Sequence, residues 1–223
     1  MDVILIAGLW LRATVWNETA DELTALGHRP LKLKLPGADD DSREATLEDQ
    51  VGAVLQAVDG LDKPVLVGHS AAATLAWIAA DRRPEAVSGV VMVGGFPASD
   101  GSRYADFFEP ADGVMPFPGW EPFDGADSVD LDQVTRERMQ AAFVPVPETV
   151  SRGVVRLADE RRFDVPVTLV CPEFSVKDAK AWIAAGDIPE LNEVREVSFV
   201  DIDSGHWPMI TRPAELAQII HDQ

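Results

Sequence analysis

The stretch that decides the fold is Val65-Leu66-Val67-Gly68-His69-Ser70-Ala71-Ala72-Ala73. Its first three residues are aliphatic and predict a buried strand, whereas the alanine-rich run over residues 71–80 predicts a helix. Only a tight turn separates the two elements, and Ser70 lies on it. Side chains two positions before and after such a serine would collide with it, so Gly68 and Ala72 fit the pattern G-x-S-x-G, with alanine in the last place. The pattern favours a nucleophilic serine, and a purely structural turn is the alternative.

Outward from this turn, short apolar runs alternate with helical patterns along the chain. Several of the runs are apolar throughout, which is typical of strands buried on both faces of a parallel sheet. Helical patterns cover Asn17–Leu26, the segment capped by Thr46, and the segment that begins near Pro213. The alternation predicts an α/β domain with a doubly wound, mostly parallel six-stranded sheet flanked by helices. The six runs are Val3–Ala7, Leu31–Leu35, Val65–Val67, Val87–Val93, Val165–Cys171 and Val197–Ile202.

Residues 97–162 interrupt the alternation. Pro97–Ser128 is rich in Pro, Gly, Asp and aromatic residues, and Leu131–Val144 and Glu148–Arg162 then carry helical patterns. About 65 residues without a strand signal are too many for an ordinary loop. We therefore predict a single domain over residues 1–223 with a helical cap insertion at 97–162.

Composition and charge exclude several classes of protein. Asp and Glu number 38 against 19 Lys and Arg in a chain of 223 residues, which gives a net charge of −19. Because phosphate recognition depends on Lys and Arg, we expect no nucleic-acid partner and no anionic membrane partner. The early apolar run Val3–Leu11 is too short to span a membrane and lacks a basic flank. Cys171 is the only cysteine and cannot form an internal disulfide, which favours a cytoplasmic location.

A serine nucleophile needs a base, and four histidines compete for this role. His69 is adjacent to Ser70, so its side chain leaves the turn in another direction. His28 is predicted to lie in a surface loop, and His221 lies near the end of the terminal helix. His206 directly follows the last predicted strand, and the carboxyl ends of parallel strands share one edge of a sheet. Position therefore favours His206 as the base for Ser70, with a loop histidine of no catalytic role as the alternative.

The chain resembles the α/β-hydrolase superfamily in a minimal form that begins at that fold's third strand. The order of serine, acid and histidine along the chain matches that of the superfamily. The turn at Ser70 matches its nucleophile elbow. The resemblance implies the α/β-hydrolase fold and a serine nucleophile. Within the superfamily, the chain is most similar to the serine esterase and hydroxynitrile-lyase branch. The matching segments are Ala7–Trp10, Leu35–Gly37, Gly68–Ala72, Val93–Pro97 and Gly205–Pro208.

The acid of the expected catalytic triad is where the sequence departs from that resemblance. Relatives carry Asp at positions that fall on or near Phe174 and Ser175 here, and neither residue is acidic. Glu173 is the nearest carboxylate, and its extra methylene could let it reach His206. Asp100, Asp178 and a Ser-His dyad without an acid remain alternatives. The acid would orient the histidine and stabilise the imidazolium.

By the same resemblance, the backbone N–H groups of Leu9 and Ala71 would form the oxyanion hole. Three aromatic residues, Trp10, Phe96 and Trp207, are predicted to contact the substrate, with core packing as the alternative for Trp10. No metal or organic cofactor is expected, because the acidic run Asp39–Asp41 lacks further ligands at suitable spacing. Cys171 is predicted to be an inert core residue.

These observations predict a serine hydrolase, most similar to a carboxylesterase, that acts on a small-molecule substrate. Aromatic residues of the insertion and Met115 indicate a small, neutral, apolar ester, and the acidic surface disfavours anionic substrates. Hydroxynitrile-lyase-like or other non-acyl chemistry on the same triad is one alternative. A lysine in the pocket would favour this alternative, but Lys177 is the only lysine near the strand ends, which counts against it. A non-catalytic ligand-binding protein of the same fold is the other alternative, and the oligomeric state stays open.

Overall fold

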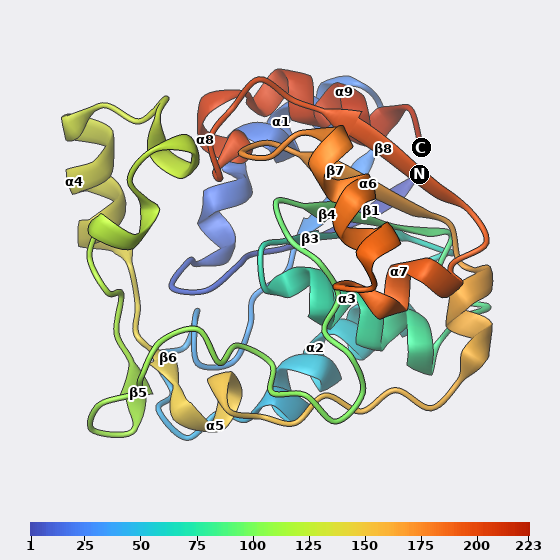
Figure 1. Ribbon diagram of the computed structural model, residues 1–223, viewed down its shortest axis with the longest axis horizontal. Helices are drawn as coiled ribbons and strands as arrows, with labels where there is room; N and C mark the ends of the chain where they lie inside the picture. Colours follow the sequence, from blue (N-terminus) through green and yellow to red (C-terminus); the bar gives the residue numbers. More distant parts are fainter.

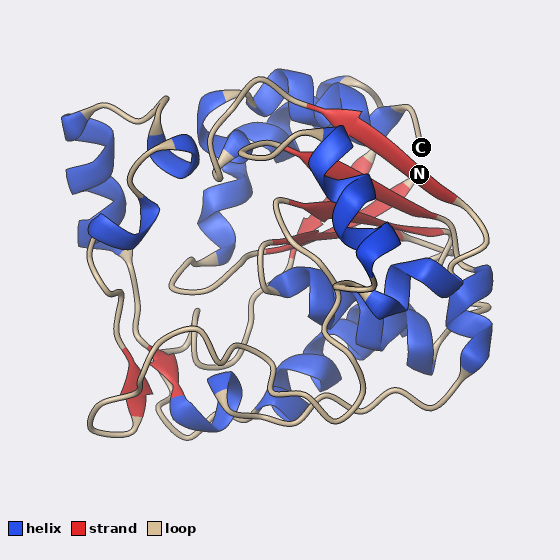
Figure 2. Ribbon diagram, viewed as in Figure 1, coloured by secondary structure: helices blue, strands red, loops and turns tan.

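Six short strands form one sheet in which every neighbouring pair runs parallel, in the order β2-β1-β3-β4-β7-β8 (Figure 2). A computed structural model describes all residues, 1–223. This confirms the predicted α/β class and the six-stranded parallel sheet. The strands are β1 Asp2–Ile6, β2 Arg29–Lys32, β3 Val65–His69, β4 Gly89–Val93, β7 Val167–Cys171 and β8 Val197–Asp201.

Helices cover both faces of the sheet, with α1 and α9 on one side and α2 and α3 on the other (Figure 1). Successive strand residues point to opposite faces, so Ile4 packs in the core beneath α2 and α3, while its neighbours Val3 and Leu5 pack beneath α1 and α9. This explains why the inner strands β1, β3, β4 and β7 are apolar at most positions. The helices outside the insertion are α1 Asn17–Ala25, α2 Leu47–Asp59, α3 Ala72–Arg82, α6 Val176–Ala185, α7 Pro189–Glu193, α8 Pro208–Thr211 and α9 Pro213–His221, with 3₁₀ turns η1 Ala13–Trp16 and η4 Glu160–Asp164.

The edge strand β2 begins two residues earlier than the sequence predicted, because it includes Arg29 and Pro30 and ends at Lys32. Proline is tolerated there because an edge strand has one side without ladder partners. Leu33 and Leu35 follow the strand and are buried, which accounts for the alternation that suggested a later strand. The N–H of Leu33 still donates to the carbonyl of Leu5, so the pairing continues briefly past the strand.

The segment 97–162, called the insert below, is less helical than predicted. It contains α4 (Gln133–Ala142), where Asp132 caps the first turn through the N–H of Thr135, so the helix expected over Leu131–Val144 is confirmed in shorter form. It also contains an antiparallel pair of two-residue strands, β5 and β6, which is too short to leave a periodic signal. The remaining elements are β5 Val114–Met115, η2 Glu121–Phe123, η3 Ala126–Ser128, β6 Val146–Pro147 and α5 Glu148–Ser151.

The helix predicted over Glu148–Arg162 is wrong between Ser151 and Glu160, and its last residues begin the 3₁₀ turn η4. The chain after α5 runs extended, and the N–H of Val155 donates to the carbonyl of Ser102 at 2.9 Å. Gly153 lies against Leu47, and a Cβ at this position would overlap the leucine side chain. Pairing with residues far away in the sequence therefore overrides the local helical pattern.

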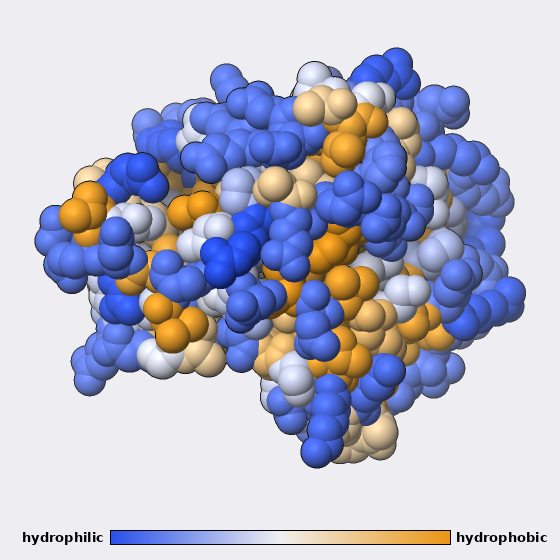
Figure 3. Space-filling view, turned by 90° about the horizontal axis from the view of Figure 1, so that it is seen from above, coloured by the Kyte–Doolittle hydropathy of each residue, from blue (hydrophilic) through white to orange (hydrophobic).

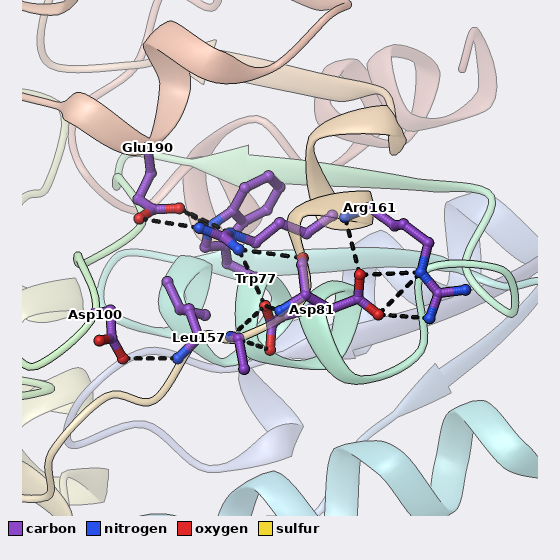
Figure 4. A network of polar contacts seen from close by, with 9 residues as sticks. Trp77, Asp81, Asp100, Leu157, Arg161 and Glu190 are labelled. Carbon is purple, nitrogen blue, oxygen red and sulfur yellow. Dashed lines mark hydrogen bonds and ion pairs between the residues drawn. The ribbon is translucent and has the colours of Figure 1, made fainter.

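A buried polar network fastens the end of the insert to α3 (Figure 4). Arg162 donates from Nε to Glu190 at 2.9 Å and from Nη1 to Asp81 at 3.2 Å, and all three side chains are buried. Trp77 donates its indole N–H to the same Glu190 carboxylate at 3.0 Å. Because α3 begins directly after Ser70, this network also fixes the helix that carries the serine turn.

The surface is mostly hydrophilic. Figure 3 shows that hydrophilic residues cover most of the face seen from above, with apolar residues in smaller areas between them. No helix of the structure is long and apolar enough to cross a membrane.

Candidate active site

Ser70 lies on the tight turn that the sequence predicted, between β3 and α3, with a positive φ of 54°. Its N–H donates to the carbonyl of Val93 at 2.8 Å, which fixes the turn to the end of β4. A Cβ at position 68 would overlap the carbonyl of Ala72, so glycine is required there and the turn can close tightly. A non-glycine residue with positive φ is strained, and the surrounding contacts hold Ser70 in this conformation.

His206 lies at the carboxyl edge of the sheet, and its Nδ1 is 2.6 Å from Oε1 of Glu173. Both side chains are largely buried, at 14% and 13% exposed. Ser70 and His206 line the same cavity, although no hydrogen bond joins the serine hydroxyl to the ring. Catalytic hydrogen bonds of this kind often tighten only when substrate binds. The structure thus brings together the serine, histidine and glutamate that the sequence singled out.

The two other acids considered for this role lie elsewhere and have local functions. Asp100 accepts a hydrogen bond from the N–H of Leu157 at 2.9 Å and so holds the extended end of the insert (Figure 4). Asp178 is exposed and accepts from the hydroxyl of Ser175 at 2.6 Å, in the capping interaction that begins α6. Neither carboxylate contacts His206, so Glu173 is the acid that the geometry favours.

The main chain of His206 is fixed from two sides by parts of the molecule that the sequence did not connect. Its N–H donates to the carbonyl of Asp127 in the insert at 2.7 Å. Its carbonyl accepts from Nε2 of His69 at 2.7 Å, which requires that this nitrogen carry a proton. Asp130 accepts from the preceding N–H, that of Gly205, at 2.9 Å. The sequence did not foresee this contact of His69 with His206.

Burial shifts the titration of groups next to His206. Burial, together with the nearby His206, holds the pKa of His69 well below its ordinary value, so this ring is neutral at neutral pH. Burial and the neighbouring Glu173 raise the pKa of Asp127, although His206 acts in the opposite direction. Burial also raises the pKa of the Cys171 thiol to about 12, so this cysteine is not a nucleophile at neutral pH.

The backbone N–H groups of Leu9 and Ala71 donate to no carbonyl of the chain. Ala71 is the N-cap residue of α3, and Leu9 lies in the turn after β1, so the two groups come from neighbouring strands of the sheet. Both residues line cavities at Ser70. Unpaired donors beside a serine are what an oxyanion hole requires.

Two cavities meet at Ser70. The aromatic cavity, of about 230 Å³, contains Ser70 and His206 and is walled mainly by large apolar side chains. The polar cavity, of about 460 Å³, lies on the other side of Ser70, and only 5 of its 13 lining residues are hydrophobic. Phe107 also lines both. The aromatic cavity is lined by Leu9, Trp10, His69, Ser70, Phe107, Phe108, Phe123, His206 and Trp207.

The three aromatic residues predicted to contact substrate lie at these cavities. Trp10 and Trp207 are buried and line the aromatic cavity, while Phe96 lines the polar cavity. Trp10 also donates its indole N–H to the carbonyl of Met115 at 3.2 Å, so it serves core packing as well. Met115 itself is fully buried and lines neither cavity. The prediction that Met115 indicates an apolar group in the substrate was therefore wrong.

The acidic run Asp39–Asp41 builds a loop. The carboxylate of Asp39 accepts from the N–H groups of Leu35 and Ala13, at 2.9 and 3.1 Å. Asp40 accepts from the N–H of Gly37 at 2.7 Å and also from that of Ser42. These contacts give the carboxylates of Asp39 and Asp40 a structural role within the loop.

A sequence profile described as the alpha/beta hydrolase family matches residues 3–219. The chain belongs to this family. The match covers the sheet, the insert and the segment that carries His206, so the family assignment rests on almost the whole chain. No curated protein sequence matches this alpha/beta hydrolase.

Solved structures of similar fold include several members of the esterase branch. An extracellular alpha/beta-hydrolase from a Paenibacillus species, described as homologous in structure and function to tobacco salicylic acid binding protein 2, has a TM-score of 0.80 at 19% identity, covering 100% of this chain and 98% of that one. A methylesterase from Arabidopsis has a TM-score of 0.77 at 15% identity, covering 99% and 97%. Tomato methylketone synthase I, solved with 2-tridecanone, has a TM-score of 0.76 at 15% identity, covering 99% and 96%. At these identities the likeness establishes the fold of this hydrolase-family chain and not its substrate.

Proposed function

We propose that this protein is a serine hydrolase that cleaves a carboxylic ester through an acyl-enzyme on Ser70. The observation that carries the proposal is the contact of Glu173 with Nδ1 of His206. His206 in turn lines the same cavity as Ser70. Glu173 orients the imidazole, and His206 takes the proton of Ser70 as its oxygen attacks the acyl carbon. The N–H groups of Leu9 and Ala71 stabilise the oxyanion. His206 then protonates the leaving alcohol and activates the water that releases the acid.

The substrate we propose is a small, neutral ester with an apolar group. The walls of the aromatic cavity support an apolar or aromatic group on one side of the ester. The net charge of −19 disfavours anionic esters through long-range repulsion. A cytoplasmic location remains a prediction, and one of the structural relatives is described as extracellular.

Chemistry without acyl transfer on the same residues is a second candidate, because one structural relative is a methylketone synthase. A lysine in the pocket would favour the hydroxynitrile-lyase form of this chemistry. Lys177 is exposed and lines neither cavity at Ser70, so the structure offers no support for that form. A non-catalytic role would leave the unpaired N–H groups of Leu9 and Ala71 without an explanation.

A fluorophosphonate probe tests the proposal, because it reacts with an activated serine. We expect labelling of the wild-type protein and none of Ser70→Ala, with hydrolysis of p-nitrophenyl esters lost in the same variant. His206→Ala should lose both as well. An unlabelled wild-type protein that keeps its folded circular-dichroism spectrum would refute the serine-hydrolase proposal. Labelling without turnover of any ester would instead favour non-acyl chemistry.

A further inference from the structure

Tyr104 is the only tyrosine of the chain, and its side chain is buried beside Ser70. It is 4% exposed and lines the polar cavity together with Ser70 and Ala71. It also lines a smaller pocket beside Gly8 and Leu9, on the side of the turn that carries the second free N–H group. Tyr104 therefore lies beside both segments of the candidate oxyanion hole.

The backbone around Tyr104 is fixed. Its N–H donates to the carbonyl of Gly153 at 2.8 Å, and the N–H of Ala105 donates to that of Ser151 at 2.9 Å. These bonds tie the segment to the extended end of the insert, which the network around Arg162 attaches to α3. The main chain that carries the ring is thus held in place without a ligand.

The phenol hydroxyl of Tyr104 makes no hydrogen bond within the chain, whereas the polar side chains of the cavity other than the proposed nucleophile Ser70 have partners. Ser102 donates to the carbonyl of Ser99 at 2.6 Å, Thr74 accepts from the N–H of Ala98 at 3.0 Å, and Arg103 pairs with Asp106. The side chain as a whole is buried, but its hydroxyl oxygen keeps some accessible surface, so it can meet a group that enters the cavity. Burial raises the pKa of Tyr104 above its ordinary value, so the hydroxyl stays protonated and can donate.

We propose that Tyr104 is a substrate-binding residue whose hydroxyl donates a hydrogen bond to an acceptor oxygen on the group that fills the polar cavity. This inference rests on the proposed function and narrows its substrate class. The ester would carry an apolar or aromatic group on one side, for the aromatic cavity. On the other side it would carry an ether, carbonyl or hydroxyl oxygen, for Tyr104. Such a site rejects an analogue without the oxygen, because the hydroxyl is then left unpaired.

Matched pairs of esters test this assignment in the wild-type protein and in Tyr104→Phe, which removes only the hydroxyl. The first pair consists of the n-butyl and 2-methoxyethyl esters of one aromatic acid, which differ by an oxygen in place of a methylene in the alcohol. The second pair places the same replacement in the acyl chain, as pentanoyl and 3-methoxypropanoyl esters. We expect the wild type to prefer the oxygenated ester in one pair, and Tyr104→Phe to lower this ratio of kcat/KM about tenfold.

Ser102→Ala is the matched control, because it removes a hydroxyl of the same cavity that already has a partner. It should leave both ratios of kcat/KM unchanged. A variant that only loosens the packing of the cavity should also leave them unchanged, because it would affect both esters of a pair alike. Equal ratios for the wild type and Tyr104→Phe in both pairs would overturn the assignment while leaving the esterase proposal intact.

Binding separates the two proposals if the esters are not hydrolysed. The N-butyl and N-(2-methoxyethyl) amides of the same acid, and the two acyl chains as amides, are titrated by calorimetry. A preference for an oxygenated amide that disappears in Tyr104→Phe would support Tyr104 even if Ser70 is never labelled. Equal affinities within each pair, in both proteins, would overturn it.

Discussion

Replacing Glu173 by Gln tests the assignment of the catalytic acid most directly. Gln keeps the length of the side chain and an oxygen that can accept from Nδ1 of His206, so the change removes the charge and little else. Two unit charges about 4 Å apart at an effective dielectric of about 20 attract by about 4 kcal/mol. This is an upper limit, because both side chains are partly exposed, at 14% and 13%.

The attraction matters mainly when His206 is protonated, which is the state that accompanies the tetrahedral intermediate. A loss of about 2–4 kcal/mol of transition-state stabilisation corresponds to a decrease in kcat/KM of about 30- to 1,000-fold. We expect kcat to carry most of this decrease, because Glu173 does not line the cavities that receive the substrate. The rate of fluorophosphonate labelling should fall in parallel.

Asp100→Asn and Asp178→Asn are the matched controls. Asp100 holds the end of the insert, and Asp178 caps α6, so both variants should keep kcat/KM within about twofold even if they lower the melting temperature. Steady-state kinetics on one p-nitrophenyl ester, with circular dichroism to verify folding, distinguishes the three variants. An unchanged rate in Glu173→Gln, or a large decrease in either control alone, would refute the assignment.

Three further predictions concern contacts around the site. Asp130→Ala removes the acceptor for the N–H of Gly205, so we expect kcat to fall about tenfold with a smaller change in KM; an unchanged kcat would count against a positioning role. Arg162→Met leaves the buried carboxylates of Asp81 and Glu190 without their arginine partner. It should destabilise the protein by about 3–5 kcal/mol, or about 6–20 °C in melting temperature. The control Arg161→Met removes an exposed ion pair and should have little effect. Because the pKa of His69 is lower in the folded than in the unfolded chain, the unfolded chain binds the proton first. Stability should therefore fall as pH drops below about 6.5, by up to about 1.4 kcal/mol per pH unit, and urea midpoints in His69→Asn should lack this contribution.

The sheet and the serine turn could be predicted because their determinants are local. Strands buried on both faces require apolar residues at every position, and the turn at Ser70 requires small residues at fixed offsets. The position of His206 followed from one topological fact, that parallel strands end at a common edge. The bounds predicted for edge strand β2 were too late in the sequence because Leu33 and Leu35, which follow the strand, are also buried.

The insert could not be predicted in the same way, because distant contacts determine its conformation. Residues after Ser151 have a helical pattern but pair with the segment near Ser102, which lies about 50 residues earlier. The strands β5 and β6 are two residues long and carry no periodic signal. Glu173 could be favoured only by resemblance, since the sequence contains 38 acidic residues and does not reveal which of them face a histidine.

The contacts of His206 indicate that the insert does more than cover the site. The ring of His206 is oriented by Glu173 from the end of β7, but its main-chain N–H depends on the carbonyl of Asp127 in the insert. Its carbonyl depends on His69, whose backbone continues directly into Ser70. A shift of the insert would therefore move the histidine relative to the serine, in addition to opening the cavity. Since a displacement of about 1 Å at a catalytic group can cost about a hundredfold in rate, placement of the insert should affect kcat as well as substrate affinity.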